Sequence, residues 1–208
     1  YKKKIFVDKK TALFHSHSVL NAKLVSFAGY LMPIQYKGVN FEHNFVRTHV
    51  GVFDISHMSQ IIINGYGAFD LLQKITTNDV SKLDIGKVQY SCMINEDGGI
   101  IDDFLVYKLS STNYMLVVNA SNAQKDFDWI CSHNDGNTDI IDITDSKSII
   151  AVQGPNSRIA LQKITNIDLS SISYYSFKKG SLLNYNNNII SNTGYTGELG
   201  FELYVDRN

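Results

Sequence analysis

Cysteine is scarce in this sequence, and the two cysteines that occur are far apart. Cys92 and Cys131 are the only ones among 208 residues, and neither belongs to a Cys-x-x-Cys pair. Structural zinc sites and disulfide frameworks both need more cysteines, or histidines, at closer spacing. The sequence therefore predicts neither kind of site, and a reducing compartment is the simpler expectation.

Charge of one sign and long hydrophobic runs are also missing. The formal net charge is −1, and the longest basic run is Lys2-Lys3-Lys4, which leaves no electrostatic footprint for nucleic acid. No apolar stretch approaches the roughly 18 residues that a membrane span needs, and no secretory signal is visible. We expect neither nucleic acid nor a membrane as a partner.

Proline is rare too, and nothing divides the chain. Only Pro33 and Pro155 occur, without a Pro/Ser-rich linker or an internal repeat. With 44% hydrophobic residues, residues 1–208 can form one domain with a core of its own. The chain begins at Tyr1 and stops at "FELYVDRN" without an evident terminus, so we expect part of a longer protein.

Segments with helical and strand-like patterns mix irregularly. Apolar spacing predicts helices at 41–51 with a stop at Gly51, at 67–76, and at 121–131 with Ser121 as N-cap. The Asn-rich segment 184–192 is interpreted as a hairpin tip. Strands are predicted at 59–64, 88–94, 103–109, 114–119, 147–153, 181–184, 188–192 and 200–205. Many strands with few long crossovers predict an α+β fold, with helices packed on largely antiparallel sheets.

Two adjacent aspartates open the strand in "INEDGGIIDDFLVYKL". Side chains alternate along a strand, so Asp103 shares a face with Tyr107, while Asp102 shares the other face with Phe104. Both faces are largely apolar, and a carboxylate at the mouth of such a strand would be partly desolvated. Either both aspartates are turn residues after the preceding glycines, or one of them is a functional carboxylate.

Three further polar residues stand beside apolar ones. Glu202, in "TGYTGELGFELYV", lies on the strand face opposite Phe201, so it points either to solvent or into a cleft. His57, in "GVFDISHMSQ", has no second ligand nearby, which favours a structural hydrogen-bonding role over a metal site. Asn119 ends an apolar strand before a helix, where its amide either caps that helix or contacts a ring with paired donors and acceptors.

The stretches "FAGYLMPIQY", "VGVFDISHMSQ", "YSCMINEDGGIIDDFLVY", "VVNASN", "AVQGPNSR" and "TGYTGELGFEL" together resemble one family. They occur in the order and approximate spacing of the aminomethyltransferase of the glycine cleavage system, its T-protein, from about Leu24 to Val205. The resemblance implies that residues 1–208 form the folate-binding aminomethyltransferase domain. Family members are longer, and the part beyond this chain holds an arginine-bearing segment that helps to grip folate and a C-terminal β-rich domain.

The resemblance also implies an enzyme with tetrahydrofolate as co-substrate. A lipoylated H-protein would deliver an aminomethyl group, the one-carbon unit would pass to tetrahydrofolate, and ammonia would leave. No metal is implied. By matching positions, Asp103 would be the catalytic residue, either holding charge or handling a proton. The implied folate-binding residues are Met58, Tyr90, Asn119, Tyr195 and Glu202.

Two other functions stay open. A related folate-dependent demethylase would share the carboxylate and the pterin pocket but take its carbon from another donor. A non-enzymatic folate-binding iron–sulfur assembly protein would carry a cysteine near "GYTGE", and no cysteine follows Cys131, which counts against it. For a T-protein, the expected location is the cytoplasm of a bacterium or the mitochondrial matrix of a eukaryote.

Overall fold

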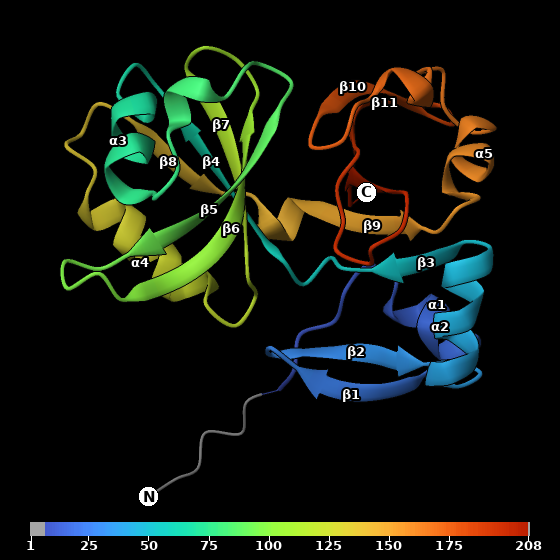
Figure 1. The fold of residues 1–208 in the computed structure, drawn as a ribbon. Helices are drawn as coiled ribbons and strands as arrows, with labels where there is room; N and C mark the ends of the chain where they lie inside the picture. Colours follow the sequence, from blue (N-terminus) through green and yellow to red (C-terminus); the bar gives the residue numbers. More distant parts are fainter. Residues whose placement is uncertain (1–6, 208) are drawn as a thin grey trace, which may run out of the picture.

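The computed structural model describes residues 7–207, which form two five-stranded sheets and a two-stranded N-terminal hairpin. Every strand pair within these sheets is antiparallel. Helices cover the outer sides of the two larger sheets (Figure 1). The predicted α+β class with largely antiparallel sheets is therefore confirmed.

The first large sheet has the strand order β5-β6-β7-β4-β8. Helices α3 (Ala68–Ile75) and α4 (Ala123–Ser132) pack on its outer face, where apolar residues of strands and helices form one buried cluster. The strands are β4 (Ser59–Asn64), β5 (Val88–Ile94), β6 (Ile100–Lys108), β7 (Asn113–Val118) and β8 (Asp139–Asp142).

The second large sheet has the order β10-β11-β12-β9-β3. Helix α5 (Ser157–Gln162) and the 3-10 turn η3 (Leu169–Ser171) pack against its outer face, over a cluster that includes Phe201 and Leu203. The strands are β3 (Gly51–Asp54), β9 (Lys147–Gln153), β10 (Phe177–Leu182), β11 (Tyr185–Ser191) and β12 (Gly200–Asp206).

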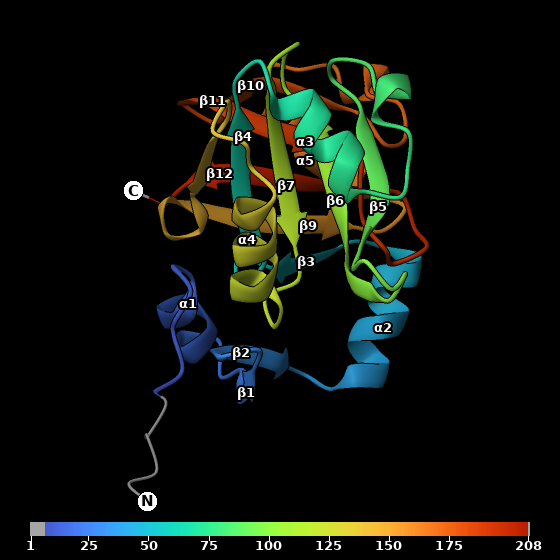
Figure 2. The ribbon, with the colours of Figure 1, turned by 90° about the vertical axis from the view of Figure 1, so that its left-hand side faces the viewer.

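A third cluster joins the two sheets through their inner faces. It contains Tyr107 and Met115 of the first sheet, and Ile149, Phe177 and Tyr204 of the second sheet. Figure 2 shows the strands of the first sheet crossing in front of those of the second. Each sheet is therefore buried on both faces at its centre, which explains why its strands are apolar on both sides.

The N-terminal part packs beside β3. It contains α1 (Phe14–Val19), β1 (Lys23–Phe27), β2 (Tyr30–Gln35) and α2 (Val39–Thr48). His17 of α1 is buried, and its ring nitrogens lie 2.8 Å from Asp54 Oδ2 and 2.8 Å from the Tyr36 hydroxyl. This buried contact attaches α1 to the end of β3.

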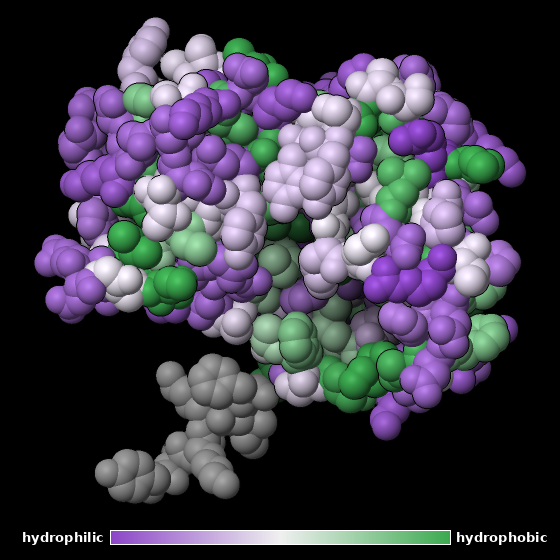
Figure 3. Space-filling model, in the orientation of Figure 1, coloured by the Kyte–Doolittle hydropathy of each residue, from purple (hydrophilic) through white to green (hydrophobic). Residues whose placement is uncertain are grey.

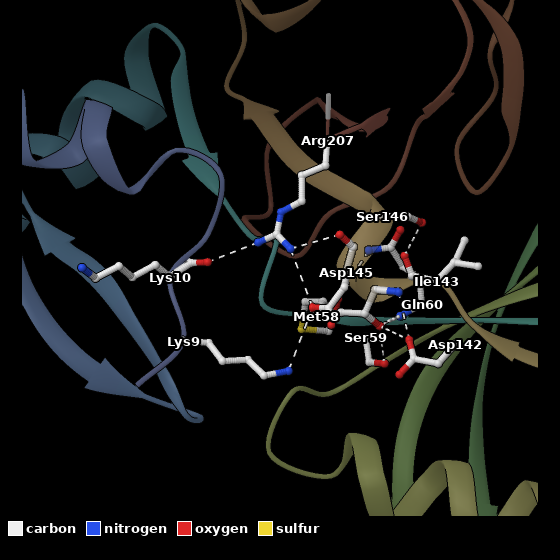
Figure 4. Close-up of polar contacts among 11 residues, drawn as sticks. Lys9, Lys10, Met58, Ser59, Gln60, Asp142, Ile143, Asp145, Ser146 and Arg207 are labelled. Atoms are coloured by element: carbon white, nitrogen blue, oxygen red, sulfur yellow. Dashed lines mark hydrogen bonds and ion pairs between the residues drawn. The ribbon is translucent and has the colours of Figure 1, made fainter. Parts of the chain in front are cut away.

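Figure 4 shows a second attachment, at the end of β12. Arg207 donates hydrogen bonds to the main-chain oxygens of Lys10 and Asp145, each at 3.2 Å. Lys9 lies 4.0 Å from the Asp145 carboxylate. The segment before α1 is thereby connected to the 3-10 turn η2 (Thr144–Ser146) that precedes β9.

The central strands and the helix at 67–76 are confirmed, but three details are wrong. The predicted helix at 41–51 ends at Thr48, and Gly51 instead opens β3. A Cβ on Gly51 would lie 2.5 Å from Val46 Cγ2, so close packing, not a helix stop, requires this glycine.

The predicted N-cap and hairpin tip also differ from the structure. Asn122, not Ser121, precedes α4, and it makes no side-chain cap; its amide nitrogen donates to Asp102. The hairpin turns at Leu183, with φ 53°, while Asn186–Asn188 lie inside β11. The elements β1, β2, β3, β8, α1 and α5 were not predicted.

Over residues 7–207, no helix is both long enough and apolar enough to cross a membrane. The same residues hold no group of three or more histidine, cysteine, aspartate or glutamate side chains placed to bind a metal. Cys92 and Cys131 are both free thiols.

Candidate functional site

Asp102 and Asp103 lie on opposite faces of β6, as strand alternation predicts. Asp102 is 5% exposed and lies on the face that α4 covers, with Phe104. Asp103 is exposed and lies on the face that carries Tyr107 into the cluster between the sheets. The turn interpretation is excluded for both residues, because each lies within the strand and pairs with β5.

Asp103 is held by two of the predicted site residues. The Tyr90 hydroxyl donates to Asp103 Oδ2 at 2.9 Å. The Asn119 amide donates to the Asp103 main-chain oxygen at 3.0 Å and lies 3.4 Å from its Oδ1. The hydrogen bond to the Asp103 carboxylate raises the pKa of Tyr90 to about 12, so this hydroxyl remains a donor at neutral pH.

The sheet register explains why these three residues meet. Tyr90 pairs with Leu105 across β5 and β6, and Leu105 pairs with Val117 across β6 and β7. In an antiparallel pair the residue two positions before Leu105 faces the residue two positions after Val117, which places Asn119 opposite Asp103. Neighbouring strands therefore supply the carboxylate and both of its partners.

Asp102 fixes Asn119 from behind. Its Oδ1 accepts from the Asn119 side chain at 3.0 Å and from the Asn122 side chain at 2.6 Å, and its Oδ2 accepts from the Asn119 backbone N–H at 3.2 Å. Burial opposes the charged form, but the neighbouring carboxyl of Asp126 and the hydrogen bonds from Asn119 and Asn122 lower the pKa of Asp102 below its ordinary value. Asp102 is thus the ionised support of the amide that contacts Asp103.

Glu202 lies deeper, between the two sheets. It is 5% exposed, so the solvated position is excluded, and it faces away from Phe201 as predicted. Thr193 Oγ1 and the Tyr204 hydroxyl donate to Glu202 Oε2 at 2.5 and 3.2 Å. Burial raises its pKa, although the hydrogen bonds from Thr193 and Tyr204 partly offset this. Since both direct donors reach Oε2, Oε1 is available to the N–H groups of a ligand.

Tyr107 connects this buried carboxylate to the strand that carries Asp103. Its hydroxyl lies 2.8 Å from the Tyr204 hydroxyl and 3.2 Å from Thr193 Oγ1. Because Tyr107 and Asp103 lie on the same face of β6, the Glu202 network and the exposed carboxylate belong to the same inter-sheet side. Sequence reasoning identified Glu202 but missed Tyr107 and Thr193, whose pattern is that of ordinary strand residues.

The other two predicted residues occupy different surroundings. Met58 is half-buried and packs against the inter-sheet cluster. Tyr195 is 89% exposed, in the loop between β11 and β12. The structure thus brings Tyr90, Asp103 and Asn119 into direct contact, whereas Tyr195 contacts none of them through a hydrogen bond.

Tyr175 is a further residue that sequence reasoning missed. It packs against the inter-sheet cluster, and its φ of 54° is a conformation that bulky residues rarely adopt. Its backbone bonds hold it there, with Val88 N–H donating to it at 2.9 Å and its own N–H donating to Asn192 at 3.0 Å. Burial, then the charges of Tyr174 and Glu202, raise its pKa. Strained residues of this kind concentrate at functional sites, but no sequence periodicity marks this one.

His57 was expected to be a hydrogen-bonding structural histidine, and this is only half right. Its ring packs edge-on against Phe27 and Tyr30, with ring centroids 5.5 and 6.4 Å apart. Its buried Nδ1 has no hydrogen-bond partner among the described residues, and burial lowers its pKa. The residue is structural through packing.

A separate apolar groove of about 610 Å³ lies between β2, α2 and β3, with Thr196 at one side. None of the six predicted site residues lines it. Figure 3 shows the face of the molecule hollowed near its centre, with hydrophobic residues along the lower edge. The exposed hydrophobic residues that line the groove are Ile34, Tyr36, Val39, Phe41, Phe45, Val52 and Phe53.

Comparison with known families and sequences gives one consistent result. The GCVT N-terminal domain family matches residues 13–208. A protein of Flavobacterium psychrophilum named aminomethyltransferase is 53% identical over 196 residues, which cover 94% of this chain and 54% of that protein. One of the same name from Halothermothrix orenii is 47% identical, over 95% of this chain and 55% of that protein. The chain therefore spans about half the length of the curated relatives it matches.

Solved structures agree with the sequence comparison. The glycine cleavage system aminomethyltransferase T of Bartonella henselae superposes with a TM-score of 0.89 at 33% identity, covering 97% of this chain and 54% of that one. A heterotetrameric sarcosine oxidase of Corynebacterium sp. U-96 superposes with a TM-score of 0.61 at 13% identity, covering 96% of this chain and 87% of that one. The second likeness concerns the fold alone.

Proposed function

Because this chain belongs to the GCVT N-terminal domain family, we propose that residues 1–208 form the folate-binding part of a glycine-cleavage aminomethyltransferase. One structural observation supports the proposal. An exposed carboxylate, Asp103, is held by Tyr90 and Asn119 on the same inter-sheet side as the buried carboxylate Glu202. A reactive centre and a polar anchor are therefore combined on one apolar wall, as a small-molecule site requires.

The proposed reaction has two substrates. A lipoylated H-protein carries an aminomethyl group on a sulfur of its lipoyl arm. The one-carbon unit passes to tetrahydrofolate, which supplies the accepting nitrogens, and the products are methylenetetrahydrofolate, ammonia and the reduced lipoyl arm. The named relatives are bacterial, which favours a bacterial cytoplasm over a mitochondrial matrix as the location.

The residues present fit a pterin ring. Such a ring offers an amide and amino groups, and Glu202 has an unoccupied acceptor oxygen in a buried position. Flat rings pack well against aromatic walls, which Tyr90 and Tyr175 can provide, and Met58 supplies an adaptable apolar contact. Tyr195 is far more exposed than the others, so its contact with folate requires the loop between β11 and β12 to bring it inward.

The chemistry of Asp103 follows from its partners. Tyr90 occupies Oδ2 with a neutral hydrogen bond, and Asn119 fixes the main chain. The carboxylate can therefore stabilise the positive charge that develops on the one-carbon unit, because it is already oriented before the reaction begins. It can also accept a proton from an amine nitrogen of tetrahydrofolate bound beside it.

Transfer between the two proposed substrates provides the test. The full-length protein that contains this chain is mixed with tetrahydrofolate and H-protein whose lipoyl arm carries the aminomethyl group, and methylenetetrahydrofolate and ammonia are measured together. We expect equal amounts of both products, and almost none with Asp103→Ala. Asp97→Asn is the matched control, because Asp97 is an exposed carboxylate in the preceding turn. If the unmodified protein forms neither product, the proposed function is wrong.

A further inference from the structure

Behind the Asp102–Asn119 support lies a third aspartate, Asp126 of α4. Its side chain is 0% exposed. Neither of its carboxyl oxygens accepts a hydrogen bond from a donor among residues 7–207. A buried carboxylate without any donor would cost several kcal/mol of unfolding free energy, so the group must be accommodated in another form.

Asn122 lies one turn before Asp126 at the start of α4, and the Asp126 backbone N–H donates to its main-chain oxygen at 2.9 Å. The Asn122 side chain donates to Asp102 at 2.6 Å, which sets the buried Asp126 carboxyl beside that of Asp102 on β6. Two ionised carboxylates have only acceptor oxygens, so they can bond to each other only when one of them carries a proton. Lys125, the neighbouring cation on the same helix, does not neutralise the pair by contact, because its Nζ donates to the main-chain oxygen of Ile101 at 2.7 Å. Asp102 and Lys125 are the charged groups that act on Asp126.

The two carboxyls differ in their other partners. Asp102 accepts three hydrogen bonds from Asn119 and Asn122, which stabilise its charged form. Asp126 has no such donor, so the proton belongs on Asp126. Burial, together with the hydrogen bond to Asp102 and its negative charge, raises the pKa of Asp126 to about 8, while the pKa of Asp102 is lowered.

We propose that Asp126 and Asp102 share one proton, and that this pair positions the reaction centre. Protonated Asp126 donates to Asp102, Asp102 holds the backbone and amide of Asn119, and Asn119 holds the main chain of Asp103. Asp126 is thus a positioning residue, which acts on the exposed Asp103 through Asp102 and Asn119. Loss of this proton would leave Asp102 and Asp126 both negatively charged, and their repulsion would weaken the hydrogen bonds by which Asp102 holds Asn119. The effect on catalysis rests on the proposed function, but the shared proton does not.

Titration of the carboxyl carbons tests the shared proton directly. Aspartate side chains are labelled with ¹³C, and their carboxyl shifts are followed by NMR from pH 4 to pH 10. We expect one carboxyl to titrate near pH 8 and to disappear in Asp126→Asn. It should persist in Asp128→Asn, which removes an exposed carboxyl two residues further along α4. The inference is overturned if no aspartate titrates above about pH 6, or if the alkaline signal survives in Asp126→Asn.

The pH profile of one-carbon transfer tests the positioning role. Asp126→Ala removes the donor to Asp102, and we expect kcat to fall about 10- to 100-fold with little change in KM. Asp126→Asn keeps a permanent N–H donor, so it should restore most of the rate and abolish the decline of kcat above pH 8. The role is overturned if Asp126→Asn is as slow as Asp126→Ala, or if its alkaline decline matches that of the unmodified protein. The comparison of alkaline decline between Asp126→Asn and the unmodified protein still decides the question if Asp126→Ala fails to fold.

The two tests separate this inference from the proposed function. If the unmodified protein transfers no one-carbon unit, the proposed function fails, while the NMR titration still decides whether the proton is shared. If transfer occurs but no alkaline carboxyl exists, the proposed function stands and this inference fails.

Discussion

Asp102 and Asp103 are neighbours in the chain but meet different surroundings. Asp102 is buried and accepts hydrogen bonds on both oxygens, whereas Asp103 is exposed and has one side-chain donor at short distance. A carboxylate that is saturated with donors supports structure, and one with free lone pairs can meet a substrate. Substitution should therefore separate the two residues.

Asp103→Asn keeps the shape of the side chain but removes its charge. We expect folding to be unaffected and one-carbon transfer to slow by about 10²- to 10⁴-fold, the range for loss of a group that handles a proton. Asp102→Asn places an amide donor against the amides of Asn119 and Asn122 and should lower the unfolding free energy by about 1–3 kcal/mol. Urea unfolding and transfer rates of both variants are the measurements. If Asp102→Asn is stable but inactive, and Asp103→Asn is active but less stable, then our assignment of Asp103 as the reactive carboxylate and Asp102 as its support is reversed.

Glu202 should make tetrahydrofolate binding depend on pH. Burial raises its pKa, so the free protein binds a proton there more readily than an exposed glutamate does. The N–H groups of a pterin need the carboxylate form, so affinity should fall as pH drops through this raised pKa and recover as pH rises. Calorimetry with tetrahydrofolate at several pH values measures this.

Glu202→Gln removes both the charge and its titration. We expect weaker binding at neutral and higher pH by about 1.5–3 kcal/mol, and the loss of the pH dependence. Glu198→Gln is the control, because Glu198 is a carboxylate of the adjoining loop that pairs with Arg47 instead. Unchanged affinity in a folded Glu202→Gln protein would contradict the assignment.

At the scale of elements, the close crossing of α2 and β9 depends on Gly154. Its φ is 129°, and a Cβ there would lie 2.5 Å from the His49 main-chain oxygen and 2.7 Å from that of Val46. Backbone atoms cannot move aside as a flexible side chain does. The end of α2 and the end of β9 can therefore meet only where this position has no side chain.

Gly154→Ala should lower the unfolding free energy by about 3 kcal/mol, because it combines overpacking with an unfavourable φ. Gly136→Ala separates the two effects, since Gly136 has φ 92° but open space around it. We expect about 1 kcal/mol for this control. Urea denaturation of both variants measures the difference, and equal losses would show that the close approach has no energetic weight.

For the whole molecule, the inter-sheet cluster should make the two sheets unfold together. Ile149 of β9 is 0% exposed and belongs to this cluster. The single tryptophan of the chain, Trp129, lies on α4, which covers the other sheet. Its fluorescence therefore reports on a part of the molecule that Ile149 does not contact directly.

Ile149→Ala should destabilise the protein by about 3 kcal/mol through loss of buried methyl groups and the cavity they leave. If folding is cooperative, the Trp129 fluorescence transition and the circular dichroism transition shift by the same amount. Ile141→Ala, at a position that is 51% exposed, should change both by less than about 0.5 kcal/mol. A fluorescence transition that stays in place would mean that the sheets unfold independently.

The sequence by itself determined the central strands, the helix near residue 70 and the two faces of β6 and β12. These depend on local periodicity, which the chain carries wherever a segment is long and buried on defined sides. Family resemblance added the six predicted site residues, and three of them do meet. The position of Asn122 before α4 was not predictable in this way, because its side chain donates to Asp102 from a distant strand. The end of α2 at Thr48 was missed because Gly51 packs against Val46 as the first residue of β3 and does not stop the helix.

Only the tertiary structure decided which residues surround those carboxylates. Strand register sets Asn119 opposite Asp103, and sheet packing brings Tyr107 to the network of Glu202. The burial of Asp126 against Asp102 joins residues from a helix and a strand, and no spacing in the sequence encodes that contact. A pKa depends on burial and on neighbouring charges in space. The residue types were therefore readable from the chain, whereas their protonation and partners were fixed only when the sheets and helices packed.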